Sequence, residues 1–186
     1  MKTKPVSPRE ITHALAEELT FSTGLLPENT LWWSNTKRGV NTAIYIPPKV
    51  RIITLQEVID KPARRFTLPI PPLVFLCSPG RAPAVYAVKR KPTHLTEVTY
   101  NAPFTNVYRE GSSCPGNHKY PQEVGKIPNN FFLSFFTTAG DVKNRSKQFP
   151  ENVLHLWADM DGKKTYPMGD LVKLGTIKDL LDEKRW

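Results

Sequence analysis

The chain has 186 residues, of which 39% are hydrophobic and 23% charged, a balance that is typical of one folded domain with its own core and excludes wholesale disorder. No apolar run approaches the roughly 20 residues of a membrane span, no signal-peptide core follows the N-terminal lysines, and two cysteines are too few for a disulfide scaffold. We therefore expect a cytoplasmic protein with reduced thiols and a net charge of +9.

The N-terminal third is predicted to form one helix and three strands. Residues 7–19 open with a capping box between Ser7 and Glu10, and apolar residues then repeat at a spacing of four, which indicates a helix. Three runs rich in aromatic and β-branched residues follow and are predicted strands: 31–35, 41–48 and 50–56. Residues 57–65 are interpreted as a short helix or a turn.

An antiparallel meander is predicted over residues 66–100, because short β-favouring runs alternate there with proline-rich breaks. Its run 71–78 is almost entirely apolar and suits a strand that is buried on both faces. The runs 84–91 and 94–100 complete the meander. Residues 111–128 contain prolines and glycines, which favour irregular structure.

Four phenylalanines dominate residues 129–140, which are predicted to form a helix that a glycine ends. Phe131 and Phe135 lie four residues apart, as do Phe132 and Phe136. This spacing places them on one side of a helix, a pattern of core packing and not of a cofactor site.

Two further elements are predicted near the C-terminus. Residues 153–166 are interpreted as a hairpin that turns at Asp161 and Gly162. Residues 176–186 are interpreted as a short helix with Thr176 as its cap.

The order of these elements predicts an α+β fold. No internal repeat or low-complexity tract appears, so residues 1–186 are expected to form a single domain. Within it, residues 1–60 form an N-terminal helix and strands, 61–140 a core that carries the loop around Cys114, and 141–186 a C-terminal hairpin and helix.

Cys114 lies in a loop of small and turn-forming residues, "GSSCPG". Cysteine is usually buried, whereas this loop favours exposure, and Gly111 can adopt a positive φ. An accessible thiol suits nucleophilic chemistry, since the thiolate is the reactive form, and Arg109 and Lys119 would add positive potential near it. The alternative is an incidental loop thiol, whereas Cys77, in its apolar run, is expected to be a buried structural residue.

The run "NVYREGSSC", residues 106–114, resembles the active-site signature of ubiquitin-conjugating enzymes. In that family an asparagine lies eight residues before the catalytic cysteine and a glycine three residues before it, which match Asn106, Gly111 and Cys114. A meander precedes the motif and a helix follows it, as predicted here. Over residues 65–118 the chain resembles more closely a bacterial branch, prokaryotic family D, also known as protein B of the PRTRC system. The segments that carry this closer resemblance are "PPLVFLCSPGR", "YAVKRKP" and "APFTNVYREGSSCPGN".

The motif departs from the usual pattern at two places. The tripeptide His-Pro-Asn of the wider family is Phe104-Thr105-Asn106 here, and the bacterial branch is known to lack this histidine. Because that histidine is mainly structural in the family, its replacement is expected to affect the architecture of the loop more than the chemistry of the cysteine. Pro115 replaces the usual aliphatic residue after the cysteine, and no gate residue for the attacking lysine is assigned.

The resemblance implies a ubiquitin-conjugating-enzyme-like fold and an acyl transferase that works through a cysteine thioester. Cys114 would accept a ubiquitin-like modifier from an activating enzyme and pass it to an amine. Asn106 would stabilise the oxyanion, brace the loop through local hydrogen bonds, or do both. The implied partners are the modifier, the activating enzyme and a metal-dependent deconjugating peptidase. No cofactor is expected, because the activating enzyme consumes the ATP.

His118, four residues after Cys114, leaves other interpretations open. As a base beside the thiol it would indicate a cysteine hydrolase. As a ligand it would indicate zinc, together with Cys77, Cys114 or His94, but no paired cysteine spacing supports a metal site. An exposed loop histidine is the favoured interpretation.

The positive charge is concentrated around the cysteine loop. Residues 61–147 contain 13 Lys and Arg against 4 Asp and Glu, while the remainder is balanced at 13 against 13. Two rival functions follow: a non-catalytic adaptor of the same fold that binds the modifier or another protein, and a basic nucleic-acid-associated protein. The basic run 88–92 lacks interleaved aromatic residues, which argues for a solvated turn or a protein-docking edge over nucleic-acid binding.

Overall fold

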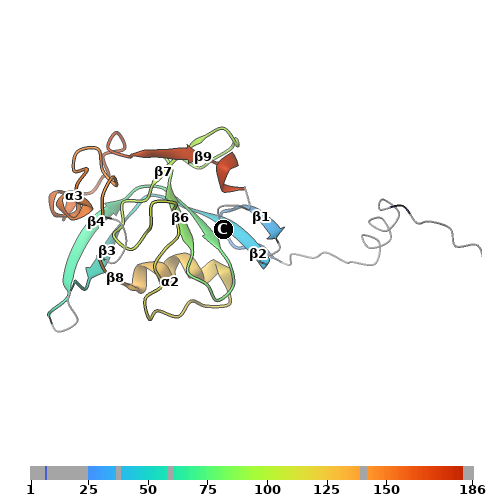
Figure 1. The fold of residues 1–186 in the computed structure, drawn as a ribbon, viewed down its shortest axis with the longest axis horizontal. Helices are drawn as coiled ribbons and strands as arrows, with labels where there is room; N and C mark the ends of the chain where they lie inside the picture. Colours follow the sequence, from blue (N-terminus) through green and yellow to red (C-terminus); the bar gives the residue numbers. More distant parts are fainter. Residues whose placement is uncertain (1–6, 8–24, 37–38, 58–60, 139–141, 182–186) are drawn as a thin grey trace, which may run out of the picture.

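The computed structural model of the protein describes residues 7, 25–36, 39–57, 61–138 and 142–181 (Figure 1). Apart from Ser7, the predicted helix 7–19 lies outside these residues. The described strands and helices together form a mixed α+β structure with a curved antiparallel main sheet and a second, smaller sheet, which confirms the predicted α+β class.

Six strands form the main sheet, in the order β1-β2-β5-β6-β7-β9, and every neighbouring pair is antiparallel. They are β1 (Thr30–Thr36), β2 (Gly39–Ile46), β5 (Leu73–Cys77), β6 (Ala84–Ala87), β7 (Val98–Asn101) and β9 (Lys173–Thr176). The consecutive pairing of β5, β6 and β7 confirms that part of the predicted meander.

A hairpin inserted between β2 and β5 leaves the main sheet after Pro47 and Pro48. Its strands β3 (Lys49–Leu55) and β4 (Arg64–Ile70) pair in antiparallel fashion, and β8 (Phe135–Phe136) adds a short parallel strand to β3. β4 therefore belongs to this second sheet and not to the meander. Residues 58–60 lie outside the described residues, but Arg64 and Arg65 are extended, so the predicted helix or turn is wrong at its C-terminal end.

The main sheet is buried on both faces at its centre. On one face, a hydrophobic cluster combines side chains of the helices and of the second sheet with Ile44, Phe75 and Val85. On the opposite face, a second cluster contains Val74 and Tyr86. Every residue of β5 is buried, as its apolar sequence predicts. In Figure 1, α2 (Ile127–Leu133) lies below the strands and α3 (Val153–Met160) beside β4.

The predicted helix 129–140 is wrong beyond Leu133. α2 starts at Ile127 and ends where Ser134 adopts an extended conformation, with both its backbone N–H and its hydroxyl donating to the carbonyl of Phe131. The chain then enters β8, where alternate side chains point to opposite faces. Phe136 is therefore buried while Phe135 is 63% exposed.

The predicted hairpin over 153–166 is also wrong, because this segment begins with the helix α3. The side chain of Asn152 accepts a hydrogen bond from the N–H of Leu154 and caps the helix. The buried side chains recur at helical spacing, at Val153, Leu156, Trp157 and Met160. The predicted turn at Asp161 and Gly162 is present, but it follows the end of α3, and Gly162 has φ +77°.

The C-terminal prediction is correct only in part. Thr176 is the last residue of β9 and not a helix cap, although the carboxylate of Asp179 accepts hydrogen bonds from its N–H and its hydroxyl. Only the short 3-10 helix Lys178–Leu180 follows among the described residues. The irregular segment 111–128 is confirmed, except for the 3-10 helix Val124–Lys126 and the first residues of α2.

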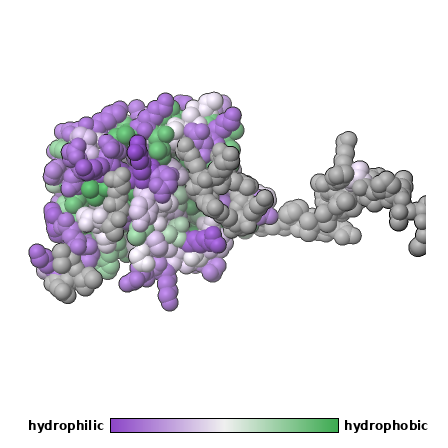
Figure 2. Space-filling view, viewed as in Figure 1, coloured by the Kyte–Doolittle hydropathy of each residue, from purple (hydrophilic) through white to green (hydrophobic). Residues whose placement is uncertain are grey.

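The surface is mostly polar. In Figure 2 hydrophilic residues cover most of the described part of the visible face, and hydrophobic ones form small separate patches. None of the described helices has the length and apolar character needed to cross a bilayer.

Candidate functional site

The loop that carries Cys114 is attached through Gly111 to the first half of β6, an interior strand of the main sheet. The carbonyl of Gly111 accepts a hydrogen bond of 2.8 Å from the N–H of Val85, and the hydroxyl of Tyr86 donates to the carbonyl of Glu110 at 2.9 Å. Gly111 has φ +102°, and a Cβ there would lie 2.3 Å from the ring of Tyr86. The residue must therefore be glycine both for its backbone angle and for its close approach to the ring.

Backbone hydrogen bonds also close the loop on itself. The N–H of Cys114 donates to the carbonyl of Asn106 at 2.8 Å, and the N–H of Tyr108 donates to the carbonyl of Ser112 at 2.7 Å. Between these contacts, Val107 and Ser113 form an isolated antiparallel bridge. These contacts fix the eight-residue separation between the asparagine and the cysteine as a short hairpin-like loop.

Asn106 and Cys114 line the same cavity, whose volume is about 300 Å³. Cys114 is half-exposed, whereas Asn106 is only 3% exposed. The side-chain oxygen Oδ1 of Asn106 has no hydrogen-bond partner among the described residues and is shielded from solvent. The structure thus brings together an accessible thiol and a buried carboxamide, the two residues that the sequence motif singled out.

Two buried side chains brace this loop from behind. Arg145 is 1% exposed, and its guanidinium donates to the carbonyl of Val107 at 2.5 Å. Trp157 of α3 donates from Nε1 to the carbonyl of Pro103 at 2.8 Å. Neither residue was among those predicted from the sequence. The helical spacing of the apolar residues around Trp157 could have revealed its position, but no pattern marks Arg145.

Tyr108 adds a hydroxyl beside the thiol. A hydrogen bond with the Cys114 side chain, helped by the charge of the thiolate, raises the pKa of Tyr108 above its ordinary value. Tyr108 is exposed, so an incoming partner can reach this pair of groups. The sequence analysis quoted this tyrosine only as part of the motif.

His118 lies on the same cavity as Cys114 and is half-buried, not exposed as the sequence analysis favoured. Its ring nitrogen Nε2 lies 2.7 Å from Oδ1 of Asn130 on α2, and its ring packs edge-on against Tyr120. This contact between the loop and α2 has no signature in the sequence.

The other candidate residues lie elsewhere. Cys77 is fully buried in β5, and burial raises the pKa of its thiol to about 12, which confirms a structural role. His94 lines a different cavity, with Trp32. Arg109 and Lys119 are exposed, and neither lines the cavity of the thiol. Within the described residues no group of three or more His, Cys, Asp or Glu side chains is placed to hold a metal ion.

Comparison with known proteins identifies the family to which this site belongs. Residues 8–174 match the model of prokaryotic E2 family D. The chain belongs to this family. The match covers far more of the chain than the window 65–118 that carries the resemblance in the sequence, and it confirms that resemblance. No curated protein and no solved structure gives a significant match.

In this E2-like protein, Phe104 occupies the position of the usual histidine and is fully buried. Its ring packs against those of Phe131, Phe132 and Phe136, with centroids 5.6 to 5.9 Å apart. Edge-to-face packing of this kind stabilises a core beyond simple burial. The loop before Asn106 is therefore anchored by aromatic packing instead of by a histidine.

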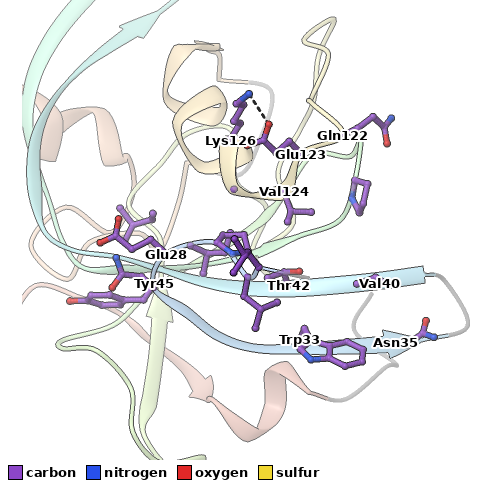
Figure 3. A pocket seen from close by; sticks show the side chains of 18 residues that line it. Glu28, Trp33, Asn35, Val40, Thr42, Tyr45, Gln122, Glu123, Val124 and Lys126 are labelled. Atoms are coloured by element: carbon purple, nitrogen blue, oxygen red, sulfur yellow. Dashed lines mark ion pairs between the residues drawn. The ribbon is translucent and has the colours of Figure 1, made fainter. Parts of the chain in front are cut away.

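A second cavity of this E2-like protein, about 900 Å³, is separate from the thiol. As Figure 3 shows, it lies between the strands β1 and β2, which contribute Trp33 and Val40, and the segment 122–126. An ion pair of 2.7 Å joins Glu123 and Lys126 at its rim. The described residues that line this cavity include no cysteine and no histidine, so it lacks the thiol of the loop around Cys114.

Proposed function

We propose that this E2-like protein has a ubiquitin-conjugating-enzyme-like fold and is a thioester carrier, which accepts a ubiquitin-like modifier on Cys114 and transfers it to an amine. The observation that carries the proposal is the placement of Cys114 and Asn106 on one cavity, in a loop closed by the hydrogen bond between their backbones. Membership of prokaryotic E2 family D supports an E2-like role and partners of the ubiquitin-like class in general.

The chemistry has two steps. The thiolate of Cys114 first attacks the thioester that joins the modifier to its activating enzyme, so the modifier moves to Cys114 and the enzyme's thiol leaves. An amine then attacks the new thioester, and the carbonyl oxygen becomes an oxyanion. The carboxamide N–H of Asn106 is the donor for this oxyanion, and removal of one such donor costs about 100- to 1,000-fold in rate in other enzymes.

The partners follow from this chemistry. The activating enzyme supplies the charged modifier and consumes the ATP, so the carrier needs no cofactor. A metal-dependent peptidase would reverse the modification. The half-exposed thiol and the exposed Tyr108 leave room for the two large partners to approach in turn.

The decisive experiment is thioester formation with purified partners from the same genomic neighbourhood. The protein is incubated with the activating enzyme, the modifier and ATP, and the products are separated on non-reducing gels. We expect an adduct that dithiothreitol removes, that Cys114→Ala abolishes and that Cys114→Ser converts into a stable ester.

Asn106→Ala provides the second part of the test. It should retain adduct formation but slow the transfer to lysine by about 100-fold, because the attack of the amine proceeds through an oxyanion for which Asn106 is the proposed donor, whereas the activating enzyme also contributes to the first step. Binding of the modifier without any adduct would show a non-catalytic adaptor instead. Retention on DNA that falls steeply with salt and ignores Cys114→Ala would favour a nucleic-acid-associated protein.

A further inference from the structure

Next to the thiol lies a histidine whose ring is held by an amide, an arrangement that supplies a base. Cys114 and His118 line the same cavity of about 300 Å³. The backbone N–H of His118 donates a hydrogen bond of 3.0 Å to the carbonyl of Pro115. This backbone hydrogen bond keeps His118, four residues after Cys114, on the same cavity as the thiol.

The contact with Asn130 decides which ring nitrogen is basic. Oδ1 of Asn130 can only accept a hydrogen bond, and it lies 2.7 Å from Nε2 of His118. Nε2 must therefore carry the proton of the neutral ring, which leaves the lone pair on Nδ1. Tyr120 packs edge-on against the ring and limits its rotation, with centroids 5.1 Å apart. Cysteine and serine enzymes often combine a nucleophile with a base and with a third residue that orients the base.

We propose that His118 is the general base that takes the proton from the attacking amine, with Asn130 as its positioning residue. The inference rests on the proposed carrier function, and it supplies the group that prepares the amine, which the motif does not contain. The other residues on the cavity include the apolar Phe135 and the small Thr137, which leave space for a slender alkylamine such as a lysine side chain.

The step balances as follows. The amine nitrogen forms a bond to the acyl carbon on Cys114, and the proton that the nitrogen must lose passes to Nδ1 of His118. The bond between the acyl carbon and the sulfur breaks, and the electron pair stays on the sulfur. The imidazolium then returns its proton to the thiolate, so the amide forms and both residues are restored.

Few titratable groups face this ring. Among the described residues that line the cavity, Cys114 is the only other one. Tyr108 is hydrogen-bonded to Cys114, and Tyr120 contacts the ring of His118 directly. No described Asp, Glu, Lys or Arg lines the cavity. A pH effect on the transfer step is assigned to His118 only where it exceeds the effect of the amine's own ionisation, which the His118→Gln variant retains.

The test needs no partner protein. Cys114 is acylated with the phenyl thioester of acetylglycine, which releases thiophenol, while the buried Cys77 does not react. Intact mass spectrometry then follows loss of the acyl group to Nα-acetyllysine or to hydroxylamine. Hydroxylamine is a much weaker base than a lysine amine, so it is uncharged at neutral pH and its adduct on the acyl carbon readily passes its proton to water. Its reaction therefore depends little on a base in the protein.

We expect His118→Gln, which keeps a donor for Asn130, to slow transfer to the lysine probe by about 100-fold or more, the usual scale of general base catalysis. Transfer to hydroxylamine should change far less. His94→Gln, at an exposed histidine on another cavity, is the matched control and should behave as the wild type does. Asn130→Asp should move the acidic limb of the lysine rate profile to higher pH, because a carboxylate stabilises the imidazolium.

Equal slowing with both nucleophiles would mean that His118 only supports the loop, and would overturn the proposal. An unchanged lysine rate in His118→Gln, or an unchanged pH profile in Asn130→Asp, would overturn it as well. Loss of the acyl group to water at a rate that depends on His118 would assign a hydrolase instead. Failure of the carrier function would show separately, as the absence of an adduct with the activating enzyme.

Discussion

The guanidinium of Arg145 donates a hydrogen bond of 2.5 Å to the carbonyl of Val107, 38 residues earlier in the chain and directly after Asn106. Arg145→Met keeps much of the volume but leaves that buried carbonyl without its charged donor. We expect a loss of about 1–3 kcal/mol in the free energy of unfolding, measured by urea denaturation. Arg109→Met, at an exposed position of the same loop, should change it by no more than about 0.5 kcal/mol. Similar values for the two variants would contradict a bracing role for Arg145.

Two glycines with positive φ flank the cysteine and provide a matched pair. Gly111→Ala introduces a Cβ 2.3 Å from the ring of Tyr86, which is itself 1% exposed and cannot move aside. At Gly116, with φ +52°, a Cβ would meet nothing within 4 Å. Gly116→Ala should therefore cost about 1–2 kcal/mol, from backbone strain alone. Gly111→Ala should lower the free energy of unfolding by clearly more than Gly116→Ala does, and it should slow alkylation of Cys114 in the folded protein. Thermal unfolding measures the first effect, and the rate of alkylation measures the second.

Restoring the residue that the wider family has before its asparagine should damage this protein. Phe104→His places a polar ring among the phenylalanines that surround position 104. We expect a loss of at least about 1–3 kcal/mol in stability, the usual cost of burying an unpaired polar group. Phe135→His, at a side chain that is 63% exposed, is the control and should have little effect. Denaturant titration distinguishes them, and a stabilised Phe104→His would refute the aromatic anchor.

The buried thiol of Cys77 makes stability depend on alkaline pH. Burial raises the pKa of Cys77 from 9.0 to about 12, so above pH 9 the unfolded chain loses this proton while the folded chain keeps it. The free energy of unfolding should therefore fall as pH rises from about 9 toward 12, by at most about 1.4 kcal/mol per pH unit from this group. Below pH 9 the Cys77 thiol keeps its proton in both the folded and the unfolded chain, so its contribution to stability is fully present.

Cys77→Ala isolates that effect. Burial also raises the pKa of Tyr120 to about 12, but this residue is common to both proteins and cancels in the comparison. Urea denaturation at pH 8 and at pH 10 should show a smaller decrease for Cys77→Ala than for the wild type. Equal decreases would mean that the Cys77 thiolate forms without unfolding.

Tyr108 should report on the state of the neighbouring sulfur. Its hydrogen bond with Cys114 raises the pKa of Tyr108, so removing the thiol in Cys114→Ala should let Tyr108 ionise at lower pH. Ultraviolet titration of the phenolate band measures this shift, and the difference spectrum of Tyr108→Phe identifies the signal. No shift in Cys114→Ala would show that the hydroxyl and the thiol do not interact in solution.

Local sequence signals predicted the strands well. β-Branched and aromatic runs separated by prolines gave β1, β2, β3 and the meander β5-β6-β7, because each run is short and clearly bounded. The phenylalanine pattern failed because a single residue, Ser134, ends α2 by bonding back to Phe131 and turning the chain into β8. Periodicity alone does not contain that change of direction.

The site was predictable only in its local part. The small, turn-forming residues around Cys114 predicted a loop in which Gly111 can adopt a positive φ, and Gly111 does so, because the contacts that form this loop are close in sequence. The support from Arg145, and the contact of His118 with α2, join distant segments whose pairing no spacing encodes. The helix α3 was missed because its alternating apolar residues also fit a strand, and the cap at Asn152 was overlooked.

The way in which main-chain contacts close the cysteine loop has a consequence for its evolution. The bonds from Cys114 to Asn106 and from Tyr108 to Ser112 involve backbone atoms only, so they do not depend on the side chains at the tip. The exposed side chains of Arg109 and Glu110 can therefore differ between relatives without displacing Cys114. In the proposed carrier, recognition of different partner proteins can therefore change at the tip of the loop while Cys114 and Asn106 keep their places.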